Sequence, residues 1–371
     1  MSGRAPDVLV VGGGLIGCAL AAELAGRGVD VTVLDRDEPG AEASGAAAGM
    51  LTPQSEAPTR DALFDLAIES RGMYPGWIAR LSDETGMDSG YRRCGFLHCR
   101  FAGENAGDFE WQRALGLRVV AESGEALAAR TGGRLSPEVS GAFFFPDEAV
   151  VDPRLLTRAA WLSALRRGAR VRTQVAVLGF VIEKGICRGV ETSEGRVAAG
   201  AVVDAAGAWA AFEGALPLRL PIEPVRGQIV ALRLPAPPFD PLVAASDVYL
   251  VPRTDGTVLL GATVERVGFH KAVTADGVAR LIGAAARLMP SLGNAVFAGA
   301  WSGLRPATPD ALPVLGASAV SGLYFAAGHH RNGILLAPVT AAVVSDLLTG
   351  GPRRDLSAFS IERFAPALHS A

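Results

Sequence analysis

Three glycines and one aspartate near the start of the chain have the spacing of a dinucleotide-binding turn. The glycines are Gly12, Gly14 and Gly17, and the acid is Asp35. In such a turn the first glycine permits a tight bend, the second lets a pyrophosphate approach the backbone, and the third lets a helix pack against a strand. Amide groups at the start of the helix attract phosphate, and the acid accepts hydrogen bonds from a ribose. The pattern therefore predicts a nucleotide site.

The segments around these residues are of the kinds that could position them. Residues 8–11 form an apolar run that predicts a strand, residues 18–26 have a helical pattern, and residues 29–34 predict a second strand that ends at Asp35. This order of strand, turn, helix, strand and acid favours a Rossmann-type α/β fold. A glycine-rich turn in an ordinary α/β protein is the alternative, and it leaves Asp35 unexplained.

Composition excludes several classes of protein. The chain has 371 residues, enough for two domains, and its net charge of -3 gives no electrostatic reason to expect nucleic acid or an anionic membrane as partner. No apolar run reaches the ~18 residues of a membrane-spanning helix. The first strand begins close to the N-terminus, which leaves no room for a signal peptide, so we expect a cytoplasmic protein. The four cysteines lack zinc-site spacing, so we expect free thiols and no metal.

The order of the predicted strands indicates two domains that interrupt each other. Strands of the nucleotide-binding type fall near the start, the middle and the end of the chain, and largely β segments lie between them. We therefore expect a discontinuous Rossmann-type domain and a second, mainly antiparallel β domain for the substrate. The first comprises residues 1–85, 146–222 and 300–371, and the second comprises residues 86–145 and 223–299.

Two later turns favour FAD over NAD as the nucleotide. A strand runs into small residues at 203–207, and a turn at 328–333 opens a helix near the C-terminus. A helix N-terminus placed there could stabilise the anion of a reduced isoalloxazine ring. An NAD enzyme would usually continue with regular βα units instead. An NAD-dependent oxidoreductase and a non-catalytic nucleotide-binding protein both stay open on this evidence.

Several segments of the chain also match those of a known family. The chain resembles the D-amino-acid oxidase superfamily of FAD-dependent amine oxidoreductases, and within it the glycine oxidases of thiamine biosynthesis. The resemblance extends over nearly the whole chain, and the segment around Arg305 is shared more widely with sarcosine oxidases and D-amino-acid dehydrogenases. The segments that carry the resemblance are residues 12–17, 44–51, 249–253, 261–263, 301–306 and 328–336.

The resemblance implies an activity that the residue spacing alone does not give. It implies non-covalent FAD and the oxidative deamination of glycine or of small amines and D-amino acids such as sarcosine, D-alanine and D-proline. Hydride would pass to flavin N5, giving a 2-oxo acid (glyoxylate from glycine), ammonia and hydrogen peroxide, with glycine imine supplied to the thiazole of thiamine. The alternative is a D-amino-acid dehydrogenase that passes electrons to an acceptor other than oxygen. The resemblance also implies a homo-oligomer, a tetramer or a dimer.

The same resemblance implies which side chains meet the substrate. Arg305 would hold the substrate carboxylate in a bidentate pair, for which guanidinium is better suited than an ammonium group, and Tyr249 would donate its hydroxyl to the same carboxylate. Arg331 would lie near both substrate and flavin. Two positions differ from glycine oxidases: Asp247 replaces a histidine and Val264 replaces a methionine. The preferred substrate therefore stays open.

Cofactor contacts are implied along the whole chain. Besides the three glycines and Asp35, the resemblance implies contacts from segments near both ends of the chain and from Val175 in its middle, with the last turn acting mainly through its backbone. These further residues are Leu15, Ile16, Arg36, Ala43, Ser44, Ala48, Gly49, Met50, Val175, His329, His330, Arg331, Asn332, Gly333, Ile334 and Leu335.

Overall fold

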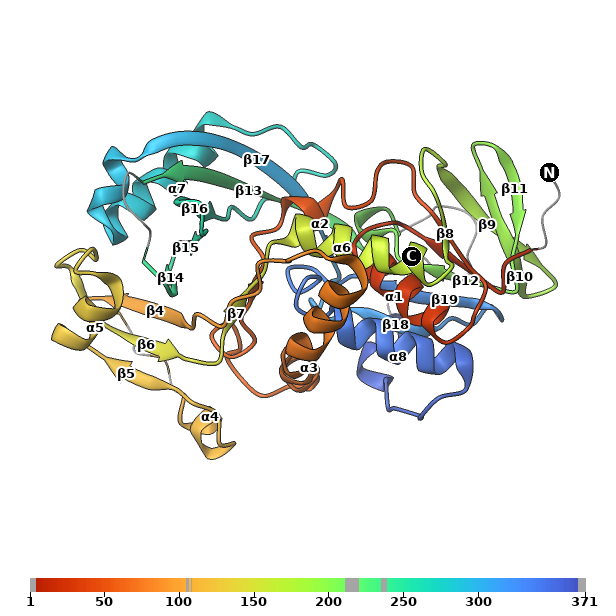
Figure 1. Cartoon of the computed structure of the whole chain (residues 1–371), viewed down its shortest axis with the longest axis horizontal. Coiled ribbons are helices and arrows are strands. Elements are labelled where there is room, and N and C mark those ends of the chain that lie inside the picture. The colour runs from red at the N-terminus through yellow and green to blue at the C-terminus, as the bar shows by residue number, and fades with distance from the viewer. Residues whose placement is uncertain (1–4, 105–106, 108, 211–219, 235–238, 366–371) are drawn as a thin grey trace.

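In the computed structural model, the chain folds around two large β-sheets that stand side by side (Figure 1). The structure describes residues 5–104, 107, 109–210, 220–234 and 239–365. Within them, no helix is both long enough and apolar enough to cross a membrane. The strands of the first sheet lie in one half of the molecule, and the strands of the second sheet lie in the other (Figure 1).

The first sheet has six strands and is parallel except at one edge. Its order is β18-β19-β12-β1-β2-β8, and only β18 runs antiparallel to its neighbour. The central strand is apolar and fully buried, as expected for a sheet covered on both faces. The strands are β1 (Val8–Val11), β2 (Val31–Leu34), β8 (Arg170–Arg172), β12 (Ala201–Asp204), β18 (Val314–Ala317) and β19 (Leu323–Ala327).

Helices cover one face of this sheet, and a small antiparallel sheet covers the other. Apart from Glu23, helix α1 is apolar on all sides because it lies between the sheet and two further helices, α6 and α8. The helices on this side are α1 (Leu15–Gly26), α6 (Pro153–Arg166) and α8 (Ala337–Thr349), and α3 (Ala62–Thr85) packs on α6 and α8 as an outer layer. The strands on the opposite face are β9 (Val177–Glu183), β10 (Ile186–Thr192) and β11 (Gly195–Ala198).

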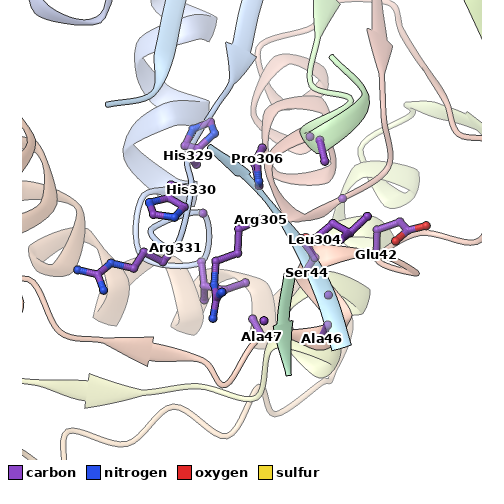
Figure 2. Close-up of a pocket in the computed structure, with 18 of the residues that line it drawn as sticks. Glu42, Ser44, Ala46, Ala47, Leu304, Arg305, Pro306, His329, His330 and Arg331 are labelled. Carbon is purple, nitrogen blue, oxygen red and sulfur yellow. The ribbon is translucent and has the colours of Figure 1, made fainter. Parts of the chain in front are cut away.

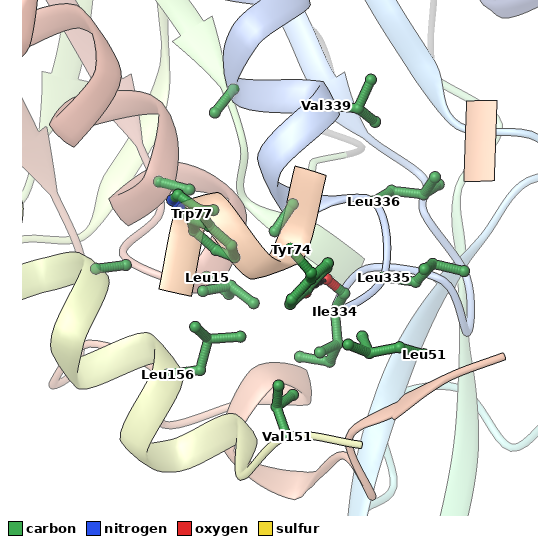
Figure 3. Close-up of a cluster of buried hydrophobic side chains, with 14 of the residues drawn as sticks. Leu15, Leu51, Tyr74, Trp77, Val151, Leu156, Ile334, Leu335, Leu336 and Val339 are labelled. Carbon is green, nitrogen blue, oxygen red and sulfur yellow. Dashed lines mark hydrogen bonds between the residues drawn. The ribbon is translucent and has the colours of Figure 1, made fainter. Parts of the chain in front are cut away.

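A buried cluster between the helices fixes the turn that precedes α8 (Figure 3). Leu15 and Trp77 pack there beside Tyr74, whose hydroxyl donates a hydrogen bond to the backbone oxygen of Ile334. The hydroxyl of Ser70 donates to the oxygen of Leu335 at 2.6 Å. Helix α3 therefore holds the backbone of this turn through two side chains that sequence patterns did not indicate.

The second sheet has eight strands in the order β17-β13-β16-β15-β14-β4-β6-β5, and only the pair β14–β4 is parallel. Helix α7 (Ala275–Leu288) packs on one face, and the other face is turned toward the first sheet's loops. The strands are β4 (Phe96–Phe101), β5 (Val120–Glu122), β6 (Val139–Phe145), β13 (Glu223–Arg233), β14 (Leu242–Ala245), β15 (Val248–Pro252), β16 (Thr257–Gly261) and β17 (Val296–Ala307).

Short elements connect these layers. Strands β3 and β7 pair with each other, and α2 lies between the two sheets (Figure 1). The short elements are α2 (Ala43–Ala46), β3 (Met50–Leu51), β7 (Ala149–Val150), α4 (Glu110–Ala114), α5 (Gly124–Thr131), η1 (Gly207–Trp209), η2 (Pro290–Asn294), η3 (Ser357–Phe359) and η4 (Ile361–Phe364).

Two local expectations from the sequence are wrong. Residues 300–304 have a strand-like pattern that predicts a strand ending just before Arg305. In the structure Arg305 lies within β17 instead, because β17 pairs with β13 through Ala307. The turn at 328–333 does not open a helix directly, since α8 begins at Ala337 and residues 333–336 form a further turn. The expected boundaries of the two domains stay a prediction.

Glu148 is a buried acid whose ionisation should make stability depend on pH. One of its oxygens accepts from the amide of Gln54 at 2.8 Å and faces Arg71 at 3.3 Å, and burial raises its pKa from 4.5 to about 8. Because the pKa of Glu148 is higher in the folded protein than in the unfolded chain, the folded protein is most stable below the pKa of the unfolded chain. It loses this stability as the pH rises toward the pKa of the folded protein. We expect the free energy of unfolding to fall between about pH 5 and about pH 9.

The matched variant Glu148→Gln keeps an acceptor oxygen but cannot ionise. Urea unfolding should therefore show a smaller loss of stability over this pH range in the variant than in the unmodified protein. Equal losses in both proteins would show that another group is responsible.

Candidate active site

A cavity of about 1310 Å³ lies between the two sheets and is lined by loops from both (Figure 2). It exceeds the roughly 300–1,000 Å³ of a typical small-molecule site. The glycine-rich turn lies along one part of it, and Arg305 and Tyr249 lie along another. The cavity therefore has room for a dinucleotide and a small substrate together.

Nearly all of the predicted site residues line this cavity. The exceptions are Leu15, which is buried in the helical core, and Gly17, which packs against the turn. The predicted residues that line it are Gly12, Gly14, Ile16, Asp35, Arg36, Ala43, Ser44, Ala48, Gly49, Met50, Val175, Tyr249, Arg305, His329, His330, Arg331, Asn332, Gly333, Ile334 and Leu335.

The structure shows a different consequence of adding a side chain at each of the three glycines of the turn. Gly12 has φ +105°, and a Cβ there would lie 2.5 Å from the oxygen of Ala205. A Cβ on Gly17 would overlap the carbonyl oxygen of Gly12, so this glycine permits α1 to approach β1. A Cβ on Gly14 would meet only the hydroxyl of Ser44, at 3.2 Å. The protein itself therefore does not require glycine at position 14.

The start of α1 offers backbone amides to the cavity. The amide of Gly13 donates to Asp35 and that of Leu15 donates to Ser44 at 3.0 Å, whereas those of Gly14 and Ile16 have no protein partner among the described residues. Unpaired amides at a helix N-terminus bind anions. This end of the cavity thus fits a phosphate group.

Asp35 lies at the end of β2 with its carboxylate held in place. One oxygen accepts from Gly13, and the other accepts from the amide of Asp37 at 2.8 Å. Burial raises the pKa of Asp35 above its ordinary value. Each oxygen keeps a lone pair, so the carboxylate can accept hydrogen bonds from a ribose diol.

Arg305 on β17 and Tyr249 on β15 come together although two strands, β13 and β16, lie between theirs in the eight-stranded sheet. The hydroxyl of Tyr249 interacts with the guanidinium of Arg305, whose Nη1 donates to the backbone oxygen of Thr263 at 3.0 Å. Burial raises the pKa of Tyr249, so the phenol stays protonated and can donate a hydrogen bond. A guanidinium beside a phenol is an arrangement that binds a carboxylate.

Two glycines that sequence patterns did not indicate make room for this pair. A Cβ on Gly227 would lie 2.4 Å from both terminal nitrogens of Arg305, and a Cβ on Gly261 would overlap the ring of Tyr249. Each glycine lies on a strand next to the one that carries the side chain it accommodates. Only the pairing of the strands reveals this requirement.

Gly227→Ala should therefore move Arg305 without unfolding the sheet. The methyl group meets the flexible end of the arginine side chain, so we expect little change in stability but a displaced guanidinium. Misplacement by about 1 Å can cost roughly 10²-fold in rate. We expect KM for an amino-acid substrate to rise at least about tenfold with flavin content unchanged, and steady-state kinetics measure this. An unchanged KM would show that the position of Arg305 does not matter.

The turn from His329 to Arg331 contributes three different side chains. His329 is buried, and its Nε2 lies 3.1 Å from the hydroxyl of Thr340 in α8. His330 lines the cavity, and burial together with the charge of Arg305 lowers its pKa to about 4, so its ring is neutral. Arg331 points away from Arg305 (Figure 2); its side chain is 55% exposed and pairs with Glu56 at 3.4 Å. The structure thus places Arg331 at the rim, apart from the Arg305–Tyr249 pair.

A set of contacts at the edge of the cavity joins the two sides. Glu42 accepts hydrogen bonds from Arg36 at 2.9 Å and from Lys271 at 2.7 Å. The guanidinium of Arg36 lies 3.8 Å from the ring centroid of Trp209, and that ring lies 5.2 Å from the ring of Phe269. The loop between β16 and α7 is thereby tied to the turn after β2. Of these residues, sequence analysis indicated only Arg36, and it did not indicate its partners in this set.

Asp247 and Val264, the two positions at which the resemblance implies a different residue, both line the cavity. Asp247 is exposed in the turn between β14 and β15 and accepts from the hydroxyl of Ser246 at 2.7 Å. Val264 is 68% exposed. Both therefore lie toward the mouth of the cavity.

The described residues contain no group of three or more His, Cys, Asp or Glu side chains that could hold a metal ion.

Comparisons with known proteins agree with this geometry. The family described as DAO, FAD dependent oxidoreductase, matches residues 7–347. The glycine oxidase of Geobacillus kaustophilus is 38% identical over 96% of this chain and 97% of its own length. Its crystal structure superposes with a TM-score of 0.93 at 36% identity, covering 96% of this chain and 98% of that one. The expected fold class and the choice of FAD over NAD are confirmed.

A second kind of relative is longer than this chain. The bifunctional protein ThiO/ThiG of Trichormus variabilis is 39% identical over 92% of this chain, which corresponds to 52% of that protein. The chain therefore spans about half the length of this curated relative.

Proposed function

Because the chain belongs to the DAO family of FAD dependent oxidoreductases, we propose that it oxidatively deaminates glycine or another small amine or D-amino acid. The observation that carries the proposal is the Arg305–Tyr249 pair, which faces the same cavity as the glycine-rich turn. Glycine oxidases are among the proteins similar to this chain, and their name supports the same substrate class.

The proposed cofactor would lie along the predicted residues. Gly14 and Ile16 would bind its pyrophosphate, Asp35 its ribose, and the segments around Gly49 and Gly333 its ring system. When bound, FAD supplies the two-electron oxidation. The observations in favour are the unpaired amides of α1 and the space above Gly14.

The chain's own residues bind and orient the substrate in this proposal. Arg305 and Tyr249 hold the carboxylate, which fixes the position of the α-carbon relative to the rest of the cavity. His330 is neutral, so it offers a hydrogen-bond acceptor without adding positive charge beside Arg305. Catalysis by the protein is then mostly orientation and electrostatics.

Product analysis tests the proposal. The FAD-loaded protein, mixed with glycine or D-alanine in air, should release ammonia, a 2-oxo acid and hydrogen peroxide in equal amounts; glyoxylate is expected from glycine. Sarcosine should give methylamine in place of ammonia, and D-proline should give its cyclic imine, each with one equivalent of hydrogen peroxide. Reduction of an artificial dye without peroxide would instead favour the dehydrogenase alternative. No product from any of these substrates would overturn the proposed substrate class.

We further propose that the protein acts in the cytoplasm as a homo-oligomer and supplies glycine imine for thiazole formation. The four cysteines are free, which suits a reducing compartment. The name ThiO/ThiG of the longer relative supports a link to thiamine. Light scattering in solution tests the oligomeric state.

A further inference from the structure

One face of the eight-stranded sheet carries a row of side chains across the cavity. Residues paired directly across neighbouring strands project from the same face of a sheet. The register of the sheet joins one residue from each of five strands in this way, and all five line the cavity. The row runs His98, Ala244, Tyr249, Gly261 and Ile229.

The row extends beyond the residues that the proposed function uses. Tyr249 holds the carboxylate in that proposal, and His98 lies two strands farther along, on β4. Neighbouring strands are about 4.8 Å apart, so the two residues are separated by about 10 Å. The residue between them in the row is Ala244, whose side chain is a single methyl group. The cavity therefore continues from Tyr249 over Ala244 to His98.

His98 has unused hydrogen-bonding capacity. Its Nδ1 is buried without a partner among the described residues, although buried polar atoms are almost always paired. Its Nε2 is not among the buried atoms, and none of the described residues forms a hydrogen bond with it, so Nε2 is the nitrogen that a ligand in the cavity can reach. Burial lowers the pKa of His98, so the ring is neutral and offers one donor and one acceptor. The neighbouring ring of Phe96 also lines the cavity, at 6.4 Å from the imidazole.

Acidic side chains near this end of the row disfavour an anion. Ser246, just after β14, donates to Asp247 at 2.7 Å and lies 3.4 Å from a carboxylate oxygen of Glu104. Glu104 also acts electrostatically on His98. The positive charge of Arg305 thus lies at one end of the cavity, and the carboxylates of Asp247 and Glu104 lie near the other end, where His98 is.

We propose that His98 and Ala244 form a subsite for the side chain of a substrate larger than glycine, an α-amino acid that ends in an uncharged hydrogen-bonding group or a cation. The inference rests on the proposed function, because Arg305 and Tyr249 must hold the carboxylate. Ala244 provides the space, and His98 provides the hydrogen bond.

The test uses four five-carbon D-amino acids that differ only at the end of the side chain, beside glycine. D-Glutamine should have a kcat/KM at least about tenfold above that of D-norvaline, because it satisfies a buried imidazole. D-Ornithine should exceed D-glutamate by a similar factor, because of the two carboxylates. The L-enantiomers are measured in parallel.

Two variants then separate the hydrogen bond from the space. His98→Leu should remove the preference for D-glutamine over D-norvaline, and His270→Leu, at a histidine that does not line the cavity, should keep it. Ala244→Leu should lower kcat/KM for all four longer substrates far more than for glycine. Flavin absorbance and the melting temperature check that each variant is folded.

The outcomes distinguish this inference from the proposed function. Oxidation of glycine but of none of the longer substrates would overturn the subsite and leave the proposed function intact. An equal effect of His98→Leu on glycine and on D-glutamine would also overturn the subsite. A flavin that no amino acid reduces would overturn the proposed function and, with it, the subsite.

Discussion

Replacing Arg305 by alanine should lower kcat/KM for glycine by about 30- to 5,000-fold while the protein keeps its flavin. Loss of one partner of a desolvated charge pair costs about 2–5 kcal/mol. Here the substrate carboxylate would lose the guanidinium and would face Tyr249 alone. Arg305 belongs to β17 and lies apart from the turn at Gly14, so FAD binding should not change. Steady-state kinetics together with flavin absorbance measure both effects.

Two conservative variants show whether geometry or charge is responsible. Arg305→Lys keeps the positive charge but loses the planar guanidinium group, so its kcat/KM for glycine should lie between that of the unmodified protein and that of Arg305→Ala. Tyr249→Phe removes one hydrogen bond and should cost less, roughly 5- to 150-fold. A normal KM in Arg305→Ala would show that the carboxylate binds elsewhere and would contradict the assignment of the site.

Gly14→Ala should weaken FAD binding by roughly 5- to 150-fold and leave the apoprotein as stable as before. The added methyl meets only the hydroxyl of Ser44 in the protein, and the backbone φ of -69° suits alanine. It would project into the space where we propose the pyrophosphate, and overpacking of this kind costs about 1–3 kcal/mol. Fluorescence titration with FAD measures the affinity, and urea unfolding measures the stability.

Gly17→Ala is the matched control for this prediction. Its methyl would overlap the carbonyl oxygen of Gly12, so it should destabilise the apoprotein itself. The two glycines thus separate an effect on the ligand from an effect on the fold. Unchanged FAD affinity in Gly14→Ala would place the pyrophosphate elsewhere.

Sequence patterns predicted the parts of the site that are local in the chain. The β1–α1–β2 unit followed from apolar runs, three glycines and one acid, because each depends on its immediate neighbours. The sequence resemblance indicated Arg305 and Tyr249, but the strand that contains Arg305 was predicted too short. Its continuation depends on pairing with Val225 of a distant segment, which no local pattern records.

The residues that sequence analysis missed all depend on contacts between distant segments. Gly227 and Gly261 make room for side chains on neighbouring strands, and His98 reaches the cavity only because β4 pairs with β14. Trp209 meets Phe269 across the edge of the cavity. Residue type alone gives no signal for such positions, since a glycine or histidine in a strand is usually structural.

The most direct test of the proposed function is the absorbance spectrum of the purified FAD-loaded protein during anaerobic titration with glycine, sarcosine, D-alanine and D-proline. We expect the flavin bands to bleach with at least one of these substrates in the unmodified protein, and to bleach in Arg305→Ala only at much higher concentrations. Flavin bands that persist with every substrate would contradict the proposal that this site oxidises small amino acids and amines.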